Sequence, residues 1–330
     1  MSSRYDEYAE YERPRRHTRP RTKDRPSYDD AATAQVVTID RGRYTLLVDD
    51  ADGRRTVTAM KSRPLGRKGV VVGDRVKVVG DTTGTPDTLA RIVEVEPRST
   101  VLRRTADDDD PVERIIVANA QRLVIVTSLA DPPPRPSLID RCLVAAYDAG
   151  MDPVLCLTKS DLATPDALVA SYEPLGVDTV ATQQGAPLEE LRDWLHGVTS
   201  VLVGHSGVGK STLVNRLVPD ADRVTSHVNA VTGRGRHTST SAIALPLPGG
   251  GLIVDTPGIR SFGLAHVDSD RLLAAFPDLA AAAAECPRGC THAADQPECG
   301  LDTAAAHGGL DPQRVTSFRR VLASLGPSGP

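Results

Sequence analysis

The stretch Gly204–Ser211 reads GHSGVGKS and matches the pattern G-x-x-x-x-G-K-[ST]. Apolar Thr199–Val203 precedes it and helix-forming Thr212–Leu217 follows, the strand–loop–helix context of a phosphate loop. Glycines let successive backbone N–H groups turn towards a pyrophosphate, at a helix N-terminus that favours anions. The lysine would reach the β- and γ-phosphates, and the serine would ligate Mg²⁺. The expected nucleotide-binding residues here are Gly204, His205, Ser206, Gly207, Val208, Gly209, Lys210, Ser211 and Thr212.

A second motif could recognise the base of the bound nucleotide. Thr158-Lys159-Ser160-Asp161 follows the apolar stretch Pro153–Leu157 and resembles the [NT]-K-x-D element of GTPases. Its aspartate can accept hydrogen bonds from guanine N1–H and N2–H₂, which adenine does not offer, so this motif disfavours ATP. Backbone at the end of the next expected strand would bind guanine O6. The expected guanine-binding residues are Thr158, Lys159, Ser160, Asp161, Ala181 and Thr182.

Two segments after the phosphate loop can complete the site. Gly233–Thr240 is polar, with two glycines and two threonines, and is suited to a switch that orders around Mg²⁺ and the γ-phosphate. The motif Asp255-Thr256-Pro257-Gly258 follows an apolar stretch, so its aspartate can hold Mg²⁺ through water, and the Gly258 N–H can meet the γ-phosphate. The expected Mg²⁺ ligands are Ser211, Asp255 and a switch threonine, either Thr238 or Thr240.

The residue that would position the attacking water differs from the glutamine of Ras-like proteins. Ile259 follows Gly258, where Ras-like proteins place a glutamine, and an isoleucine cannot orient water. His237 lies in the expected switch beside the candidate Mg²⁺ threonines, so it is our candidate catalytic residue. The alternative is that His237 is a solvent-exposed loop residue.

The cysteines indicate a metal site. Three of the five lie between residues 286 and 299, together with a histidine, and such clustering in a long cytosolic chain favours metal over disulfides. A Cys₃His set suits one closed, structural, tetrahedral Zn²⁺. Cys142 and Cys156 lie in apolar stretches and are expected to be core thiols. The expected zinc ligands are Cys286, Cys290, His292 and Cys299.

The part of the chain that precedes these motifs is expected to form a small β-barrel. Short alternating segments predict an OB-fold, with an SH3-like barrel as the alternative. Basic residues suit RNA phosphates, and with Tyr44 as the one aromatic residue we expect recognition by shape and charge rather than base stacking. A merely soluble charged surface is the alternative. The expected strands are 35–40, 44–48, 55–59, 75–79 and 91–96, and the cations are Arg54, Arg55, Lys61, Arg63, Arg67, Lys68, Arg75 and Lys77 against Asp74.

Beyond the charged stretch Asp107–Pro111 the pattern changes to alternating strands and helices, which predicts a parallel sheet covered on both faces. Asp311–Leu325 has the pattern of an amphipathic helix. The expected strands are 122–127, 153–157, 177–181, 201–203 and 252–254, and the expected helices are 137–149, 165–171, 188–196 and 212–217.

These patterns divide the 330 residues into four parts. We expect a disordered basic tail over residues 1–33, either a solvated extension or an arm for RNA phosphate, and a barrel over 34–105. A GTPase domain over 111–264 and a zinc-binding helical domain over 265–330 follow. The net charge of −4 excludes a global polyanion-binding character, and the lack of a long apolar run predicts a cytoplasmic protein without membrane contact.

The base motif precedes the phosphate loop, the reverse of the Ras-like order, as expected if old termini were joined and new ones opened. In this the chain resembles circularly permuted GTPases, and most closely the ribosome small-subunit-dependent, RsgA-type family. Thr158 stands where that family more usually has Asn, which predicts a looser tie to the phosphate loop without loss of guanine preference. Cys290 is displaced by about one residue from the family spacing. The matching stretches are 91–104 closing the barrel, 158–161, 204–213, 236–240, 255–258 and 286–299.

The resemblance implies an OB barrel, a permuted GTPase domain and a zinc-binding helical domain. It implies a monomer that binds GTP and GDP and hydrolyses GTP in late maturation of the small (30S) ribosomal subunit, stimulated by that subunit and its rRNA. Because Gly258 leads directly into the zinc-binding domain, nucleotide state is expected to tilt that domain. The alternatives are a large-subunit assembly GTPase and a nucleotide-gated RNA-binding protein with little turnover.

Overall fold

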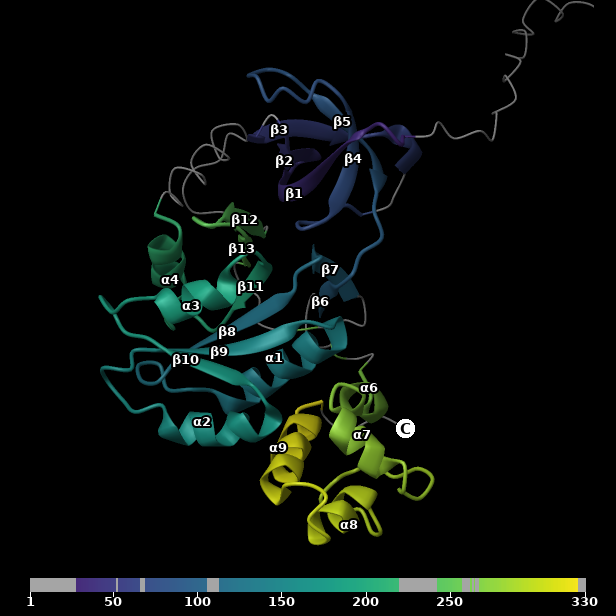
Figure 1. The fold of residues 1–330 in the computed structure, drawn as a ribbon, viewed down its shortest axis with the longest axis vertical. Helices are drawn as coiled ribbons and strands as arrows, with labels where there is room; N and C mark the ends of the chain where they lie inside the picture. Colours follow the sequence, from purple (N-terminus) through teal and green to yellow (C-terminus); the bar gives the residue numbers. More distant parts are fainter. Residues whose placement is uncertain are drawn as a thin grey trace, which may run out of the picture. The chain divides into compact units, whose positions relative to one another are not determined.

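The computed structural model describes residues 28–51, 53–65, 69–105, 113–219, 242–256, 262, 264 and 267–325. Residues 1–30 and 31–330 form two separate units, and the following concerns the second (Figure 1). The basic tail expected over residues 1–33 lies almost entirely outside the described residues. The division expected between residues 105 and 111 stays a prediction.

The N-terminal strands form a closed barrel in the order β1-β2-β3-β5-β4, in which β1 also pairs with β4. Because β3 and β5 are parallel and all other neighbours are antiparallel, the barrel has the OB-like arrangement rather than the SH3-like alternative. Inward-facing residues such as Val36, Leu46, Val57 and Ile92 are fully or almost fully buried. The strands are β1 (Ala32–Asp40), β2 (Arg43–Asp50), β3 (Gly53–Lys61), β4 (Arg75–Gly80) and β5 (Ala90–Val95), with a 3₁₀ turn η2 (Arg63–Leu65) after β3.

Strand β1 contains an irregularity between Val36 and Thr38, where its register with β2 shifts by one residue. Val36 is buried in the barrel core, and its neighbour Val37 is buried instead in the cluster of the central domain. A bulge re-aims one side chain of a strand without ending the pairing. Strand β1 therefore contributes to two cores.

Residues 91–104 do not all close the barrel, contrary to expectation. Strand β5 lies in the barrel, but β6 (Val101–Thr105) pairs with β7 (Glu113–Ala118) in a separate two-stranded sheet. This hairpin is joined to the barrel at Gly73, where an added Cβ would lie 2.0 Å from the carbonyl oxygen of Ala118. The Asn119 amide donates to the Gly73 carbonyl, so the chain is held closely at this junction.

The central sheet has six strands, five of them parallel and β12 antiparallel at one edge. In sheet order they are β10 (Asp178–Ala181), β9 (Asp152–Thr158), β8 (Arg122–Ser128), β11 (Thr199–Val203), β13 (Leu252–Asp255) and β12 (Ile243–Pro246). The associated helices are α1 (Pro136–Ala149), α2 (Asp166–Tyr172), η3 (Glu173–Leu175), α3 (Glu189–Leu195) and α4 (Lys210–Leu217). The expected alternation is thus confirmed, and β12 is an addition to it.

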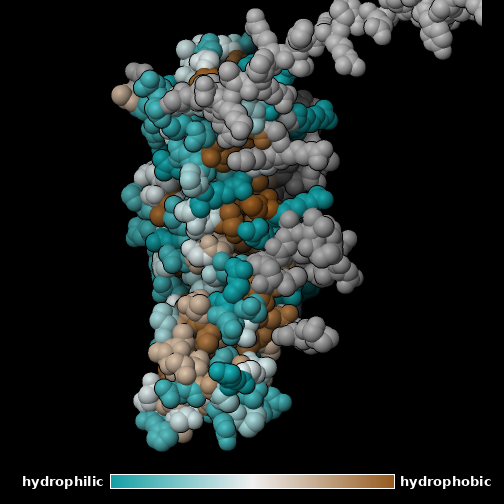
Figure 2. Space-filling model, turned by 90° about the vertical axis from the view of Figure 1, so that its right-hand side faces the viewer, coloured by the Kyte–Doolittle hydropathy of each residue, from teal (hydrophilic) through white to brown (hydrophobic). Residues whose placement is uncertain are grey.

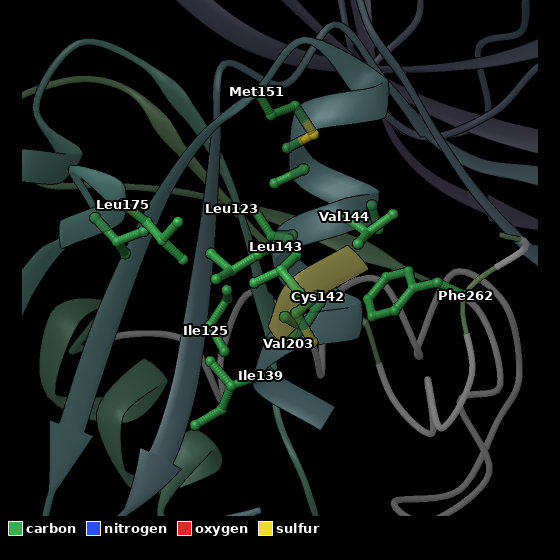
Figure 3. Packing of buried hydrophobic residues seen from close by; sticks show 14 of the residues in the cluster. Leu123, Ile125, Ile139, Cys142, Leu143, Val144, Met151, Leu175, Val203 and Phe262 are labelled. Atoms are coloured by element: carbon green, nitrogen blue, oxygen red, sulfur yellow. The ribbon is translucent and has the colours of Figure 1, made fainter. Parts of the chain in front are cut away.

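Successive residues of the strands enter opposite cores. Leu123 and Ile125 of β8 pack in the cluster that contains α1, whereas Val124 and Val126 pack with α3 and α4. Figure 3 shows Leu143 of α1 close to Leu123 and Ile125 of β8. Cys142 and Cys156 are buried, as expected of core thiols, and burial raises the pKa of each to about 12.

The C-terminal part is helical, with α6 (Ser269–Leu273), α7 (Pro277–Ala283), α8 (Gly300–Ala306) and α9 (Pro312–Ala323). Phe276 packs edge-on against Tyr147 of α1 and Phe318 of α9, with ring centroids 4.8 and 5.5 Å apart. Arg320 of α9 pairs with buried Asp140 of α1 at 3.3 Å. These contacts dock the helices on α1.

In the described part of the chain, no helix has the length and apolar character needed to span a membrane. Figure 2 shows one face, on which hydrophilic residues cover most of the surface and hydrophobic residues lie in small groups among them.

Candidate nucleotide site and metal centre

The motifs expected to bind phosphate and base follow strands of the same sheet and lie at one edge of it. Val203 ends β11 before the phosphate loop, Thr158 ends β9 at the base motif, and Asp255 ends β13. Because β9, β8, β11 and β13 are parallel, their carboxyl ends lie at the same edge. Chain order also reverses between β8 and β11, the position at which such sheets bind ligands.

Glycines bring the phosphate loop close to neighbouring backbone. A Cβ added to Gly204 would lie 2.3 Å from the carbonyl oxygen of Val126, so a side chain there would push the loop away from β8. Gly209 has a φ of +90° and precedes α4 directly. Lys210 therefore begins a helix whose first N–H groups face outward from its N-terminus, as anion binding requires.

The base motif is tied to the phosphate loop by Thr158. Its hydroxyl donates to the carbonyl oxygen of Val208 at 2.7 Å, and it lies 3.3 Å from the carbonyl oxygen of Thr127. The residue is buried, at 7% exposure. The shorter threonine therefore does make the tie that we expected to be loosened.

The remaining base-motif residues are arranged around the ends of β9 and β10. The Ser160 N–H donates to the Thr182 carbonyl, and the Thr182 N–H donates to the Leu157 carbonyl at 2.8 Å. This N–H is therefore already used inside the protein, and the buried Thr182 hydroxyl has no hydrogen-bond partner among the described groups. Asp161 is exposed and Lys159 donates to the carbonyl oxygen of Asp131. Ala181, the last residue of β10, pairs with Leu157.

The expected phosphate and magnesium groups also meet. The Lys210 ammonium lies 3.5 Å from Asp255 Oδ1, across the ends of α4 and β13. That oxygen is buried and has no hydrogen-bond partner among the residues that the structure describes. Thr256, the next residue, donates from its hydroxyl to the Leu202 carbonyl at 2.9 Å and so fixes the end of β13 against β11. A buried carboxylate oxygen facing a lysine suits a Mg²⁺–triphosphate ligand.

Several predicted residues lie outside the described part of the chain. They are His237, Thr238, Thr240, Gly258 and Ile259. Their roles in catalysis and in magnesium and γ-phosphate binding stay predictions.

Sequence reasoning missed Arg216. From α4 its guanidinium donates to the carbonyl oxygen of Gln183 at 3.0 Å and to that of Ala186, both in the loop after β10. It thereby joins the helix of the phosphate loop to the loop expected at guanine O6. Nothing in the local pattern marked this arginine, because its partners are backbone groups 30 and 33 residues away.

The four expected metal ligands come together. The reactive atoms of Cys286, Cys290, His292 and Cys299 all lie within 4.8 Å of one another. Nδ1 of the histidine is 3.5 Å from the Cys290 sulfur, 3.6 Å from the Cys286 sulfur and 3.9 Å from the Cys299 sulfur. The Gly300 N–H donates to the Cys286 sulfur at 3.1 Å, which favours a thiolate. This Cys₃His cluster can hold a metal ion.

Arg319 supports the cluster from α9. Its Nε donates to the His292 carbonyl at 2.9 Å, and its two terminal nitrogens bind the Asp302 carboxylate at 2.7 and 2.8 Å. The arginine holds the pKa of Asp302 below its usual value. His307, by contrast, bonds to the Thr303 carbonyl and does not belong to the cluster.

The basic face of the barrel is partly neutralised, which the sequence reasoning did not foresee. Arg54 pairs with Asp49 at 2.9 Å and Arg55 pairs with Asp50 at 2.7 Å. The turn between β2 and β3 places these residues opposite or nearly opposite one another. A further pair joins Arg75 to Glu96, and Arg67 and Lys68 lie outside the described residues.

Comparisons with known proteins agree with this geometry. The model of the RsgA GTPase family matches residues 95–265. A small ribosomal subunit biogenesis GTPase RsgA from Pseudomonas aeruginosa is 38% identical over 287 residues, covering 84% of this chain and 81% of the relative. The protein of that name from Chlorobaculum parvum is 35% identical over 295 residues, covering 85% and 94%.

Solved structures share the fold. The structure of YloQ, described as a circularly permuted GTPase, has a TM-score of 0.67 and 23% identity, covering 93% of this chain and 99% of that one. YjeQ from Thermotoga maritima has a TM-score of 0.67 and 26% identity, covering 89% and 98%.

The barrel, the permuted motif order and the joined loops define a circularly permuted P-loop GTPase with an OB-like N-terminal barrel. The chain belongs to the RsgA GTPase family, and it is an enzyme that hydrolyses GTP.

Proposed function

We propose that this enzyme hydrolyses GTP during late maturation of the small (30S) ribosomal subunit and that the subunit and its rRNA stimulate hydrolysis. The nucleotide-binding part of this proposal rests on the direct hydrogen bond from the Thr158 hydroxyl to the Val208 carbonyl. This bond joins the base motif and the phosphate loop in one site. The ribosomal part rests on the relatives, which are named small ribosomal subunit biogenesis GTPases.

In this proposal the chain's own residues bind and orient the nucleotide. Asp161 accepts from guanine, the Gly204–Gly209 backbone surrounds the phosphates, and Lys210 leaves Asp255 to contact them. Ser211, Asp255 and Thr238 or Thr240 would hold the Mg²⁺ that accompanies GTP, and the ion would neutralise charge on the phosphates. The buried oxygen of Asp255, which has no hydrogen-bond partner in the described part of the chain, supports that assignment.

Water positioning is assigned to His237, because Ile259 cannot do it. Gly258 would contribute its N–H to the γ-phosphate. Ala181 and Thr182 lie beside the base motif, where the purine O6 would bind, and because the Thr182 N–H already donates to the Leu157 carbonyl, the Ala181 N–H is the proposed donor. Phosphoryl transfer needs positioning and charge stabilisation more than covalent chemistry, so a site of this kind is sufficient.

The barrel is our proposed rRNA-binding domain. On its outer face Arg43 of β2 lies opposite Met60 of β3, and Met60 lies opposite Arg91 of β5. All three side chains are exposed, and neither arginine has an acidic partner among the described residues. The single barrel aromatic, Tyr44, is buried, so contact through phosphates is favoured over base stacking.

The metal of the Cys₃His cluster is proposed to be one structural Zn²⁺. Zn–S and Zn–N bonds of ordinary length give sulfur–sulfur distances of about 3.8 Å and nitrogen–sulfur distances of about 3.6 Å in a tetrahedron. The cluster has 4.0 Å between the Cys286 and Cys299 sulfurs and 3.5–3.9 Å from Nδ1. We further propose that the protein acts as a cytoplasmic monomer and that nucleotide state tilts the zinc-binding helices.

The test is GTP turnover measured with and without purified small subunits, with large subunits as the control. The proposal expects slow intrinsic turnover and stimulation by small subunits alone. Stimulation by large subunits only would instead indicate a role in large-subunit assembly. Equal turnover in all three conditions would overturn the ribosomal assignment and leave the GTPase assignment intact.

A further inference from the structure

The bulge in β1 places a barrel residue in the core of the GTPase domain. Val37 is 7% exposed and belongs to the cluster that contains Ala244, Leu252 and Val254, not to the barrel core that contains Val36. Strand β1 contacts β12, which carries Ala244. The partly buried barrel residue Leu47 packs against the same cluster.

The strand contacted by β1 occupies a particular position in the chain. Residues 220–241, which carry the expected switch with His237, run directly into β12. Within the sheet β12 pairs with β13, and Ile243 of β12 lies opposite Asp255. The same strand therefore follows the switch in sequence and lies beside the residue that faces Lys210.

A polar contact accompanies the apolar one. Gln35 Nε2 lies 3.5 Å from the Thr199 hydroxyl at the start of β11, and the Thr199 N–H donates to Gln121 Oε1 at 2.7 Å. These groups sit at the amino ends of the strands, opposite the nucleotide edge. The barrel is thus fixed to the sheet at one end, and Val37 at the bulge lies in the apolar cluster that also contains Ala244 of β12.

We infer that Val37 is a positioning residue that couples the barrel to the nucleotide site, through β12 and its pairing with Asp255. A displacement of the barrel on RNA would move the strand that holds one end of the switch. A packed side chain transmits such a displacement because close-packed cores resist compression. This inference rests on the proposed stimulation by the small subunit and adds the route by which it reaches the site.

The experiment compares Val37→Ala with Val79→Ala in the full-length protein. Val79 is a half-buried residue of β4 on the outside of the barrel and belongs to none of the three buried clusters. Each change removes the same two methyl groups from the barrel. For both variants, intrinsic GTP turnover, GTP affinity and binding to small subunits with GDP should match the unmodified protein.

The expected result is that Val37→Ala lowers the stimulation by small subunits about fivefold or more. An effect of about fivefold is at the lower end of the coupling usually measured between two sites of one protein. Val79→Ala should keep full stimulation. Because coupling is reciprocal, Val37→Ala should also reduce the ratio of subunit affinities measured with a non-hydrolysable GTP analogue and with GDP. A purely structural docking role would lower stability without changing that ratio.

Each of the other possible results of this experiment would contradict a specific part of the inference. Full stimulation and an unchanged affinity ratio for Val37→Ala would overturn the coupling inference alone. Equal loss in both valine variants would show that barrel stability, rather than the Val37 contact, is responsible, and would also overturn it. An unmodified protein that small subunits do not stimulate would overturn the proposed function and this inference together.

Discussion

The Thr158 hydroxyl lies 2.7 Å from the carbonyl oxygen of Val208, so the base motif and the phosphate loop share a buried hydrogen bond. The two residues are 50 positions apart in the chain. A base-reading loop and a phosphate-binding loop must be held at a fixed separation to bind both ends of one nucleotide. This bond supplies that constraint directly.

Replacing Thr158 by Val should weaken GTP binding about tenfold. The change keeps the side-chain shape and removes the hydroxyl, leaving the Val208 carbonyl buried without its donor, at a cost of about 1–3 kcal/mol. Titration with a fluorescent GTP analogue would measure the effect, and Thr158→Ser is the matched control that keeps a donor. Equal affinities for the valine and serine variants would contradict this prediction.

Replacing Asp161 by Asn should lower GTP affinity by about two orders of magnitude or more and raise affinity for xanthosine triphosphate. The amide would present a donor where guanine also presents donors, whereas xanthine presents an acceptor. Asp166→Asn, on an exposed residue at the start of α2, is the control and should retain guanine preference. Competition binding with both nucleotides tests this prediction. An unchanged nucleotide preference in the Asp161 variant would show that Asp161 does not contact the base.

Replacing Cys290 by Ser should abolish metal binding at the Cys₃His cluster. Three remaining ligands hold Zn²⁺ much less tightly, and short ligand loops depend on the metal for their fold. Elemental analysis of purified protein should give one zinc per chain for the unmodified protein and none for the variant. Cys142→Ala is the matched control because that thiol is buried in the core away from the cluster. Full zinc content in the Cys290 variant would refute the ligand assignment.

The pair between Arg314 and Asp278 should make thermal stability depend on pH. Hydrogen bonding to Arg314 lowers the pKa of Asp278 below its ordinary value of 3.8. The pair therefore stabilises the folded protein above pH 3.8, and this contribution is lost as pH falls through the folded-state pKa. Because the carboxylate is well exposed, Asp278→Asn should lower the Tm at pH 7 by only about 2 °C.

The difference in Tm should shrink as the pH is lowered towards 3. Asp178→Asn, on an exposed residue of β10, controls for general charge effects and should leave the Tm unchanged at pH 7. A gap between the Asp278 variant and the unmodified protein that is constant from pH 7 to pH 3 would argue against the ion pair as its source.

Much of the fold was predictable because local patterns determine it. The helix expected over residues 137–149 is observed as Pro136–Ala149, since its apolar face, its leading proline and its terminal Gly150 all agree. Alternation placed the ends of the barrel strands to within three residues. The doublet Val36-Val37 interrupts that alternation and is the one sequence sign of the bulge.

Long-range pairings were not predictable. Asp49 and Asp50 neutralise Arg54 and Arg55 only because the hairpin register brings them together, so a count of charges overestimated the free basic face. Strand β12 has only four residues, and its sequence IALP shows no alternation that would mark it as a strand.

The metal ligands were predictable because all four lie close in sequence. Arg319, which holds the His292 backbone from another helix, was not.

The contact of β1 with β12 has a consequence for solubility. Strand β12 is the last strand of the central sheet on its side, and unpaired strand edges promote aggregation unless something covers them. Strand β1 of the barrel contacts β12, and Val37 covers part of the apolar cluster that contains Ala244. A fragment that begins at residue 113 would lack this contact and should self-associate more readily than the full chain, which light scattering would measure.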